Sequence, residues 1–283
     1  MIGTLPPSAR SVTSPAPKAP GPPEHISPTA AKSYLGCSLR FFFERVACLP
    51  CPTGPALHLG KVIHAALQHF HLALWRGTDH SAPTIAKHFE QVFTAMEQDE
   101  GPVSWKDDAA RDKAREAGLR VVQAYLTSPE VLTTPPKAVE VFLSERIDGL
   151  SVPLTGAMDL VRQDLTPVDF KSAAARPDPK QAAFDHELQL VSYQLMLESA
   201  TGQSPPALEL VFLVKTKVPQ VIKVRVQPAD SRRKERVVRM LETAVTGIAE
   251  QRFHPQPGMQ CSWCQFRTEC SKWPSVAVEG RGR

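Results

Sequence analysis

Two aspartates and a lysine in the middle of the chain have the types and spacing for chemistry at a phosphate group. Asp159 lies near the end of one predicted strand, and Asp169 and Lys171 lie on the next. A short turn between antiparallel strands would bring the two carboxylates together, where they repel each other unless a cation such as Mg²⁺ bridges them. Residues 169 and 171 share a face of their strand. Lys171 could therefore orient a metal-bound water or stabilise charge on a phosphoryl oxygen.

The pattern also has a structural explanation. An Asp-x-Lys sequence on a strand is common by chance, and an exposed ion pair there would contribute little to stability. The elements around the three residues decide whether they form a site.

Hydrophobic periodicity predicts several helices, then a sheet, then further helices and strands. The turn Asp148-Gly149 is typical of a hairpin between the first two strands. This order indicates one α/β domain with a mixed sheet. Helices are predicted at 30–34, 57–75, 85–96, 109–126, 187–200 and 230–251, and strands at 138–147, 150–161, 168–171, 208–214 and 221–226.

Composition sets the limits of that domain. The chain has 283 residues, 42% of them hydrophobic, which is enough for a sizeable core. Eight of the 27 prolines lie in the first 30 residues, so we expect residues 1–27 to be a disordered proline-rich tail. Residues 276–283 are expected to be a second disordered tail. The single domain is expected at 28–275, with a helical part at 57–127, the sheet core at 138–226 and a cysteine cluster at 261–270.

Charge and hydropathy exclude some classes of protein. The net charge of +4 permits a nucleic-acid partner without requiring one. No apolar run approaches the roughly 18 residues that span a bilayer, and the amino terminus lacks the apolar segment of a secretory signal. We therefore expect a cytoplasmic protein that does not bind a membrane.

Four short motifs follow one another along the chain. They are Gly60-Lys61-Val62-Ile63-His64, Gly156-Ala157-Met158-Asp159, Val168-Asp169-Phe170-Lys171 and Gln189-Leu190-Val191-Ser192-Tyr193. In order and spacing they resemble the Gly-x-x-x-His, Gly-x-x-Asp, Asp-x-Lys and Gln-x-x-x-Tyr motifs of the RecB-like PD-(D/E)XK nucleases, over residues 29–270. The resemblance implies a restriction-endonuclease-like α/β core, with a central mixed sheet flanked by helices and an N-terminal helical insertion.

The resemblance also implies roles for these residues. Asp159, Asp169 and the backbone carbonyl of Phe170 would hold Mg²⁺ or Mn²⁺, and His64 would complete or adjoin the metal site. Lys171 would assist the attacking water. For His64 the alternative is a structural core histidine, since it lies on an otherwise apolar helix.

Three further residues belong to the same resemblance. Gln189 and Tyr193 lie one helical turn apart and share a face, which the family places beside the substrate; Tyr193 could instead be a core residue whose hydroxyl bonds the backbone. An upstream glutamate also belongs to the pattern, and Glu140 fits it best. Strand alternation favours Glu145 as the more buried acid, because it shares a face with Val139 and Val141.

Six cysteines form a separate pattern. Cys261, Cys264 and Cys270 place three thiols within ten residues, and in a cytosolic chain this spacing favours a metal over disulfides. The chain resembles the branch of the family that includes AddB and the nuclease of CRISPR adaptation. In that branch one cysteine before the core, here Cys37, and three after it hold a [4Fe-4S] cluster. Such a cluster would join the two ends of the domain.

A structural Zn²⁺ site is the alternative for the cysteines. It would use two Cys-x-x-Cys pairs, Cys48 with Cys51 and Cys261 with Cys264, but it would leave two cysteines unused. We expect the iron–sulfur cluster, and we assign no role to Cys48 and Cys51.

The resemblance implies a metal-dependent DNA nuclease, expected to be an exonuclease on single-stranded or frayed ends. DNA repair, recombination, CRISPR and phage-related DNA processing all suit such an enzyme. The chain has no Gly-x-x-x-x-Gly-Lys-Ser/Thr loop, so a helicase, like a CRISPR integrase, would have to be a partner protein. The alternatives are a catalytically silent module of the same fold that binds DNA or a protein, with a structural cluster, and an iron–sulfur redox sensor.

Overall fold

The computed structural model describes residues 22–99, 101–128 and 135–273. Residues 1–21 of the tail expected at 1–27, and the whole of the tail expected at 276–283, lie outside the described residues. The ordered chain nevertheless begins before the predicted boundary at residue 28. Ile26 is 1% exposed, and its N–H donates to Pro153 O at 3.0 Å. Helix α1 (Pro28–Gly36) follows, with the Ser27 hydroxyl accepting from Ala30 N at 3.1 Å.

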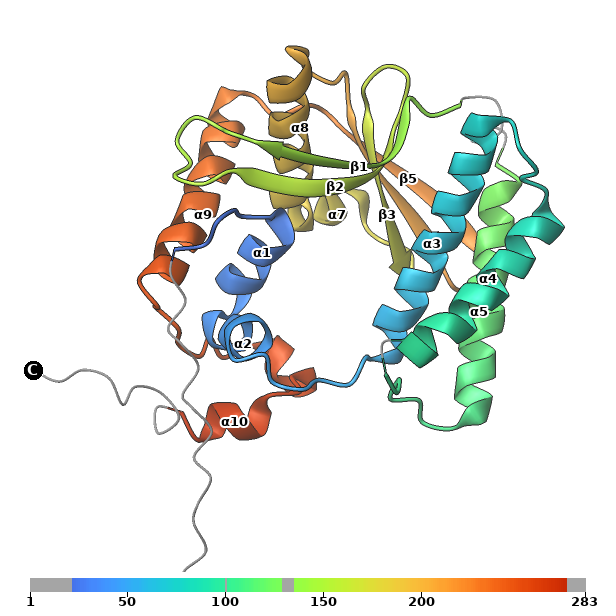
Figure 1. Ribbon diagram of the computed structural model, residues 1–283, viewed down its shortest axis with the longest axis horizontal. Coiled ribbons are helices and arrows are strands. Elements are labelled where there is room, and N and C mark those ends of the chain that lie inside the picture. Colours follow the sequence, from blue (N-terminus) through green and yellow to red (C-terminus); the bar gives the residue numbers. More distant parts are fainter. Residues whose placement is uncertain (1–21, 100, 129–134, 274–283) are drawn as a thin grey trace, which may run out of the picture.

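Three long helices form one side of the domain (Figure 1). They are α3 (Pro55–Arg76), α4 (Ala82–Asp99) and α5 (Asp108–Leu126), each within three residues of its predicted bounds. Their apolar faces share a core with strand residues that include Leu160, Val168 and Phe170. Gly118 permits close packing here, since a Cβ would lie 2.6 Å from Leu59 Cδ1.

The sheet has five strands in the order β1-β2-β3-β4-β5. Their bounds are β1 Ala138–Glu145, β2 Leu154–Val161, β3 Pro167–Ala173, β4 Leu208–Val214 and β5 Gln220–Val226. Strands β3 and β4 pair in parallel and all other neighbours are antiparallel. The mixed sheet expected from the sequence is therefore confirmed.

The first hairpin differs from the prediction. The turn is present, with Leu150 N donating to Ile147 O and Gly149 at φ +87°. However, β2 begins at Leu154, not at residue 150. Ser151 instead bonds the carboxylate of Glu242 through its N–H at 2.9 Å. This bond to α9 (Ser231–Ala249) holds the chain away from the ladder.

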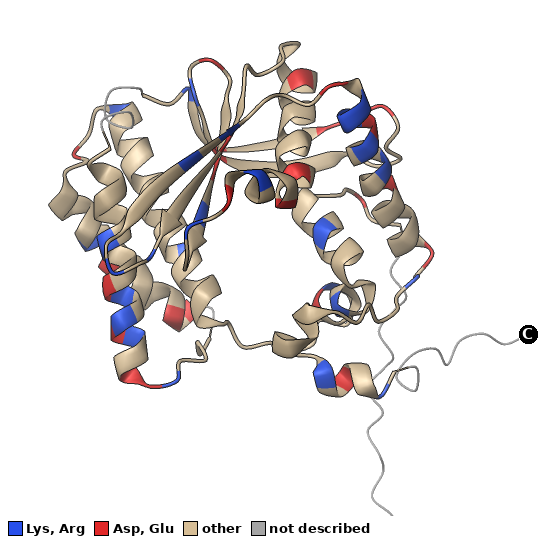
Figure 2. Ribbon diagram, turned by 180° about the vertical axis from the view of Figure 1, so that it is seen from behind, with Lys and Arg blue, Asp and Glu red and all other residues tan. Residues whose placement is uncertain are grey.

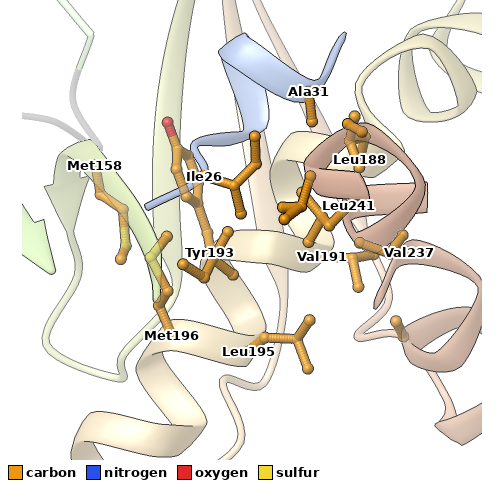
Figure 3. Packing of buried hydrophobic residues seen from close by; sticks show 14 of the residues in the cluster. Ile26, Ala31, Met158, Leu188, Val191, Tyr193, Leu195, Met196, Val237 and Leu241 are labelled. Atoms are coloured by element: carbon orange, nitrogen blue, oxygen red, sulfur yellow. The ribbon is translucent and has the colours of Figure 1, made fainter. Parts of the chain in front are cut away.

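The other face of the sheet is covered by helices that follow the strands. Helices α7 (Pro179–Asp185) and α8 (Glu187–Thr201) form the crossover between the parallel strands, and α9 (Ser231–Ala249) packs on α8 and α1. Residues such as Val191, Met196 and Leu241 fill this layer (Figure 3). The two helical layers enclose the middle of the sheet, so the residues of β4 are buried on both faces.

The two ends of the domain lie together. Helix α2 (Ser38–Phe41) and the π-helix Phe42–Val46 adjoin the 3-10 helix Met259–Trp263 and α10 (Arg267–Ser271). A small apolar cluster of Leu39, Phe43 and Phe266 joins them. Figure 1 shows this group on the side of the molecule away from α3, α4 and α5.

None of the helices within these described ranges combines the length and the apolar character needed to cross a bilayer.

Candidate active site

Strands β2 and β3 separate where the two aspartates stand. The ladder pairs Val161 with Pro167 and Leu160 with Val168, and one further step in this register would set Asp159 opposite Asp169. At this point a bond to a side chain takes the place of the backbone ladder: Asp159 Oδ2 accepts a hydrogen bond from the N–H of Phe170 at 2.7 Å. This separation of β2 and β3 at Asp159 and Asp169, which we call the fork, brings the two carboxylates together in the middle of the sheet.

Asp169 is the most buried acid of the site, with 3% of its surface exposed. Its Oδ1 accepts from Gln189 Nε2 at 2.7 Å, and Lys171 Nζ lies 2.6 Å from its Oδ2 as an ion pair without hydrogen-bond directionality. Burial raises the pKa of Asp169, Lys171 opposes that rise, and the charge of Asp159 adds to it. The carboxylate is therefore costly to ionise unless a cation stays beside it.

Gln189 connects the catalytic candidates on β3 to α8. Its Oε1 accepts from Lys171 Nζ at 2.9 Å, and its Nε2 also donates to Tyr193 OH at 2.8 Å. The Tyr193 hydroxyl donates to Ala157 O at 2.8 Å, and burial raises the pKa of this phenol. Tyr193 thus has the backbone contact of a core residue as well as a contact with the site.

His64 reaches the fork from α3. Its Nδ1 lies 3.2 Å from Asp159 Oδ1. Burial lowers the pKa of His64, but the hydrogen bond and the charge of Asp159 outweigh burial and raise it above the usual 6.5. In the absence of a metal, a protonated His64 therefore neutralises Asp159.

This pair gives the protein a predictable pH dependence. Because the pKa of His64 is raised on folding, its contribution is fully present below the unfolded pKa of about 6.5 and is lost as the pH rises through the folded pKa. We expect metal-free protein to melt at a lower temperature at about pH 8 than at about pH 6, and His64→Gln to show a smaller difference. Thermal denaturation in EDTA measures both; equal differences in the two proteins would contradict this role of His64.

Glu140 and Glu145 take different positions. Glu140 has φ +51°, which breaks the alternation of β1: Val139 packs toward α3, α4 and α5, whereas Val141 packs toward α8. Burial and the charge of Asp159 raise the pKa of Glu140. Glu145 instead accepts from Ser199 Oγ at 2.8 Å at the far end of the strand. The structure brings Glu140, not Glu145, to the site.

A pocket of about 530 Å³ opens beside these residues. It lies between α3 and β3 and continues from the fork toward the exposed Leu57. The lining includes Gly60, Lys61, His64, Gln68, Glu140, Lys171 and Ser172. A substrate group in this pocket would lie against the catalytic candidates of both elements.

The sequence motifs did not predict an aromatic stack that lies beneath the fork. The ring of Phe170 stacks on His71 at 5.9 Å and meets Tyr125 edge-on at 5.3 Å. His71 Nε2 lies 2.6 Å from Tyr125 OH, and burial lowers the pKa of His71 to about 3. A neutral His71 therefore holds Phe170, whose N–H orients Asp159. The available clue in the sequence was the spacing of seven residues between His64 and His71, which places both on one face of α3.

Comparison with known proteins identifies the family. The family model described as "PD-(D/E)XK nuclease superfamily" matches residues 25–271. The chain belongs to the PD-(D/E)XK nuclease superfamily. Membership makes it a nuclease, a phosphodiesterase whose expected substrate is DNA.

One solved structure supports the fold. A protein of Eubacterium rectale described as "Putative exonuclease" superposes with a TM-score of 0.58 at 13% identity, covering 92% of this chain and 91% of that chain. A protein designated SSO0001 gives a TM-score of 0.40 at 14% identity, covering 90% and 88%. No curated protein matches the sequence.

PD-(D/E)XK nucleases generally use Mg²⁺ or Mn²⁺. Within residues 22–273, gaps aside, no three His, Cys, Asp or Glu side chains are arranged to hold a metal ion. At the two aspartates, Lys171 lies at Asp169 Oδ2 and His64 lies at Asp159 Oδ1, the positions that a cation would take. The oxygen donors suit a hard cation, and the buried Oδ2 without a hydrogen bond would gain most from one. The residues fit the metal once Lys171 leaves Asp169 Oδ2 and a neutral His64 exchanges its contact with Asp159 for one with the ion.

The cysteines of the predicted cluster gather at the joined ends of the domain. Burial raises the pKa of the Cys270 thiol, and the charges of Cys37, Cys264 and Cys261 raise it further. The thiols of these three cysteines therefore lie near that of Cys270. All four are half-buried, whereas Cys48 and Cys51 are exposed. Cys51 Sγ contacts the side chain of Gln265.

Proposed function

We propose that this protein is a metal-dependent DNA nuclease, an exonuclease that hydrolyses phosphodiester bonds at single-stranded or frayed DNA ends. The observation that carries the proposal is the fork, where Asp159 and Asp169 face each other and Lys171 is held beside them by Gln189. Two acids and a lysine in this arrangement, beside an open pocket, suit phosphodiester hydrolysis.

The proposed roles follow from the contacts. Asp159, Asp169, the carbonyl of Phe170 and His64 would hold Mg²⁺ or Mn²⁺, which when bound activates water and offsets charge on the phosphate. Lys171 would orient the attacking water or stabilise the developing negative charge. Its ammonium is already directed by Gln189 Oε1 at 2.9 Å.

The three simultaneous contacts of Gln189 support a positioning role for α8. Gln189 bonds Lys171, Asp169 and Tyr193 at once. Movement of one of these groups would therefore be transmitted to the others. Gln189 and Tyr193 are proposed to hold the reactive groups beside the substrate.

Glu140 is proposed as the further acid of the site, and a matched pair of variants tests it. Glu140→Gln is expected to raise the Mg²⁺ concentration for half-maximal cleavage about tenfold, because it removes a negative charge next to Asp159. Glu145 lies on the same strand but bonds Ser199 at its far end, so Glu145→Gln should titrate like wild type. Metal titrations of both variants decide between them; equal midpoints would exclude Glu140.

The four neighbouring thiols support a [4Fe-4S] cluster held by Cys37, Cys261, Cys264 and Cys270. The same contacts give it a structural role, since it would join the first and last segments of the domain. A helicase or a CRISPR integrase is the proposed kind of partner, in DNA repair, recombination or CRISPR- and phage-related processing. A zinc site would instead need the two exposed cysteines.

The test of the function uses end-labelled and circular DNA, each single- and double-stranded, with Mg²⁺, Mn²⁺ or EDTA. We expect metal-dependent shortening of linear single strands, slower shortening of blunt duplexes and no cleavage of circles. Cleavage of circles would show an endonuclease. Binding without cleavage in either metal would show a catalytically silent module and would overturn the proposal.

A further inference from the structure

Most basic residues of the longest basic run of the sequence, on α9, already pair with acidic side chains of the protein. On α9, Arg233 and Arg236 both bond Glu187, and Lys234 bonds Glu198. In Figure 2 blue segments for Lys and Arg alternate with red segments for Asp and Glu along the ribbon of α9. A cation that already has an acidic partner gains less from a phosphate, so the substrate-binding cations lie elsewhere.

Lys32 is one cation that the motifs did not indicate. It lies on α1, and its Nζ donates to Asp185 O at 2.9 Å, at the end of α7. Burial lowers the pKa of Lys32, and repulsion by Lys171 lowers it further, by more than the charge of Asp185 raises it. The ammonium groups of Lys32 and Lys171 are thus close enough to repel each other.

The lowered pKa of His186 indicates the same local excess of positive charge. His186 stands between α7 and α8, and burial, then Lys171, then Lys32 lower its pKa to about 4. The imidazole is therefore neutral near pH 7 and leaves the charge to the two lysines. An anion placed between Lys32 and Lys171 would relieve their repulsion.

Lys215 is a second such cation, on the other side of Lys171. Its N–H donates to Ala173 O at 2.8 Å, so it stands at the carboxyl end of the parallel pair β3 and β4. Ligands of α/β sheets bind outside this end of the strands. The register sets Lys215 one strand away and three residues beyond Lys171, about 10 Å along the sheet. By strand alternation the side chain of Lys215 follows that of Leu213 to the face of α3 and α5, opposite Lys171, so the two lysines flank the carboxyl edge of the sheet.

The ammonium of Lys215 is half-buried, and within the described part of the chain it has no hydrogen-bond or ion-pair partner. Burial lowers its pKa, and no acid among those residues acts against burial. A partly desolvated charge without a partner costs free energy in the isolated protein. Binding an external anion would recover that cost.

We propose that Lys32 and Lys215 bind the phosphates on either side of the scissile one, so that a single DNA strand passes from α1 over Lys171 to the end of β4. This inference rests on the proposed function and specifies its substrate path. Lysine suits the task because an ammonium binds a phosphate as a point charge from any direction. Lys32 and Lys215 are positioning residues in this scheme.

The test measures binding of a labelled single strand in EDTA over a range of salt concentrations. Lys32→Ala and Lys215→Ala are each expected to weaken binding about three- to tenfold and to reduce the slope of log K against log salt by about 0.7. Lys113→Ala, which removes an exposed lysine from α5, is the control and should keep the wild-type slope. In cleavage assays KM should rise more than kcat falls.

Stability separates binding from a structural role. Lys215→Met should leave the melting temperature unchanged or raise it, because it removes an unpaired charge, and yet weaken DNA binding. Lys32→Arg should restore the slope lost in Lys32→Ala. If wild type binds and cleaves DNA while the variants keep its affinity and slope, the phosphate path is wrong and the nuclease stands. If wild type neither binds nor cleaves, the proposed function itself fails.

Discussion

Lys171→Met is expected to lower kcat by about a hundredfold to a thousandfold, the usual effect of removing one positioned group that stabilises transition-state charge. The ammonium of Lys171 lies 2.6 Å from Asp169 Oδ2 and is directed by Gln189. No other lysine in the described residues bonds both groups, so none can replace it. Single-turnover cleavage of a labelled strand measures the loss directly.

The same substitution will also affect stability, and a second variant separates the two effects. Removing Lys171 leaves Asp169 buried without its cation, which costs on the order of 3 kcal/mol. Asp169→Asn combined with Lys171→Met removes both charges, so it should recover most of that stability but none of the activity. Lys87→Met, an exposed lysine on α4, is the control. A stable Lys171→Met protein that cleaves at the wild-type rate would exclude Lys171 from the reaction.

Cys270→Ser is expected to abolish iron binding and to lower the melting temperature by on the order of 10 °C. The cluster would close a segment of more than two hundred residues between Cys37 and Cys261. Losing it would free the joined ends, which otherwise share a small apolar cluster around Phe43 and Phe266. Anaerobically purified wild type should contain about four irons per chain and absorb visible light.

The exposed cysteines provide the matched control. Cys48→Ser with Cys51→Ser should keep the iron, the colour and the melting temperature, because both thiols are exposed and neither is among the thiols whose charges act on Cys270. A structural Zn²⁺ site makes the opposite prediction: this double variant would lose zinc and stability, whereas Cys37→Ser and Cys270→Ser would not. One zinc and no iron in the wild type would decide for that alternative.

Local sequence determined most of the secondary structure. Helical periodicity placed α3, α5 and α8 within two residues of their observed bounds, and strand patterning placed β4 over 208–214. Residue spacing also determined which side chains share a face: Asp169 with Lys171, and Gln189 with Tyr193. These properties depend on a few neighbouring residues, so they can be recognised without the fold.

Glu140 shows where that reasoning fails. Alternation along a regular strand favoured Glu145, but φ +51° at Glu140 reverses the direction of the side chains on either side of it. The exchange of packing between Val139 and Val141 depends on two cores built by distant helices. A pattern read from neighbouring residues cannot predict such a reversal.

The sequence by itself determined the family motifs, the mixed α/β order and the residues available for a metal. Only the tertiary structure decided how those residues meet: His64 reaches Asp159 across 95 residues, and Lys32 reaches Asp185 across 153. It also decided that Arg233 and Arg236 of α9 pair with Glu187, and that Lys215 has no acid beside it within the described residues. The physical reason is that pairing and burial of charges depend on which surfaces pack together, and spacing along the chain carries no record of that.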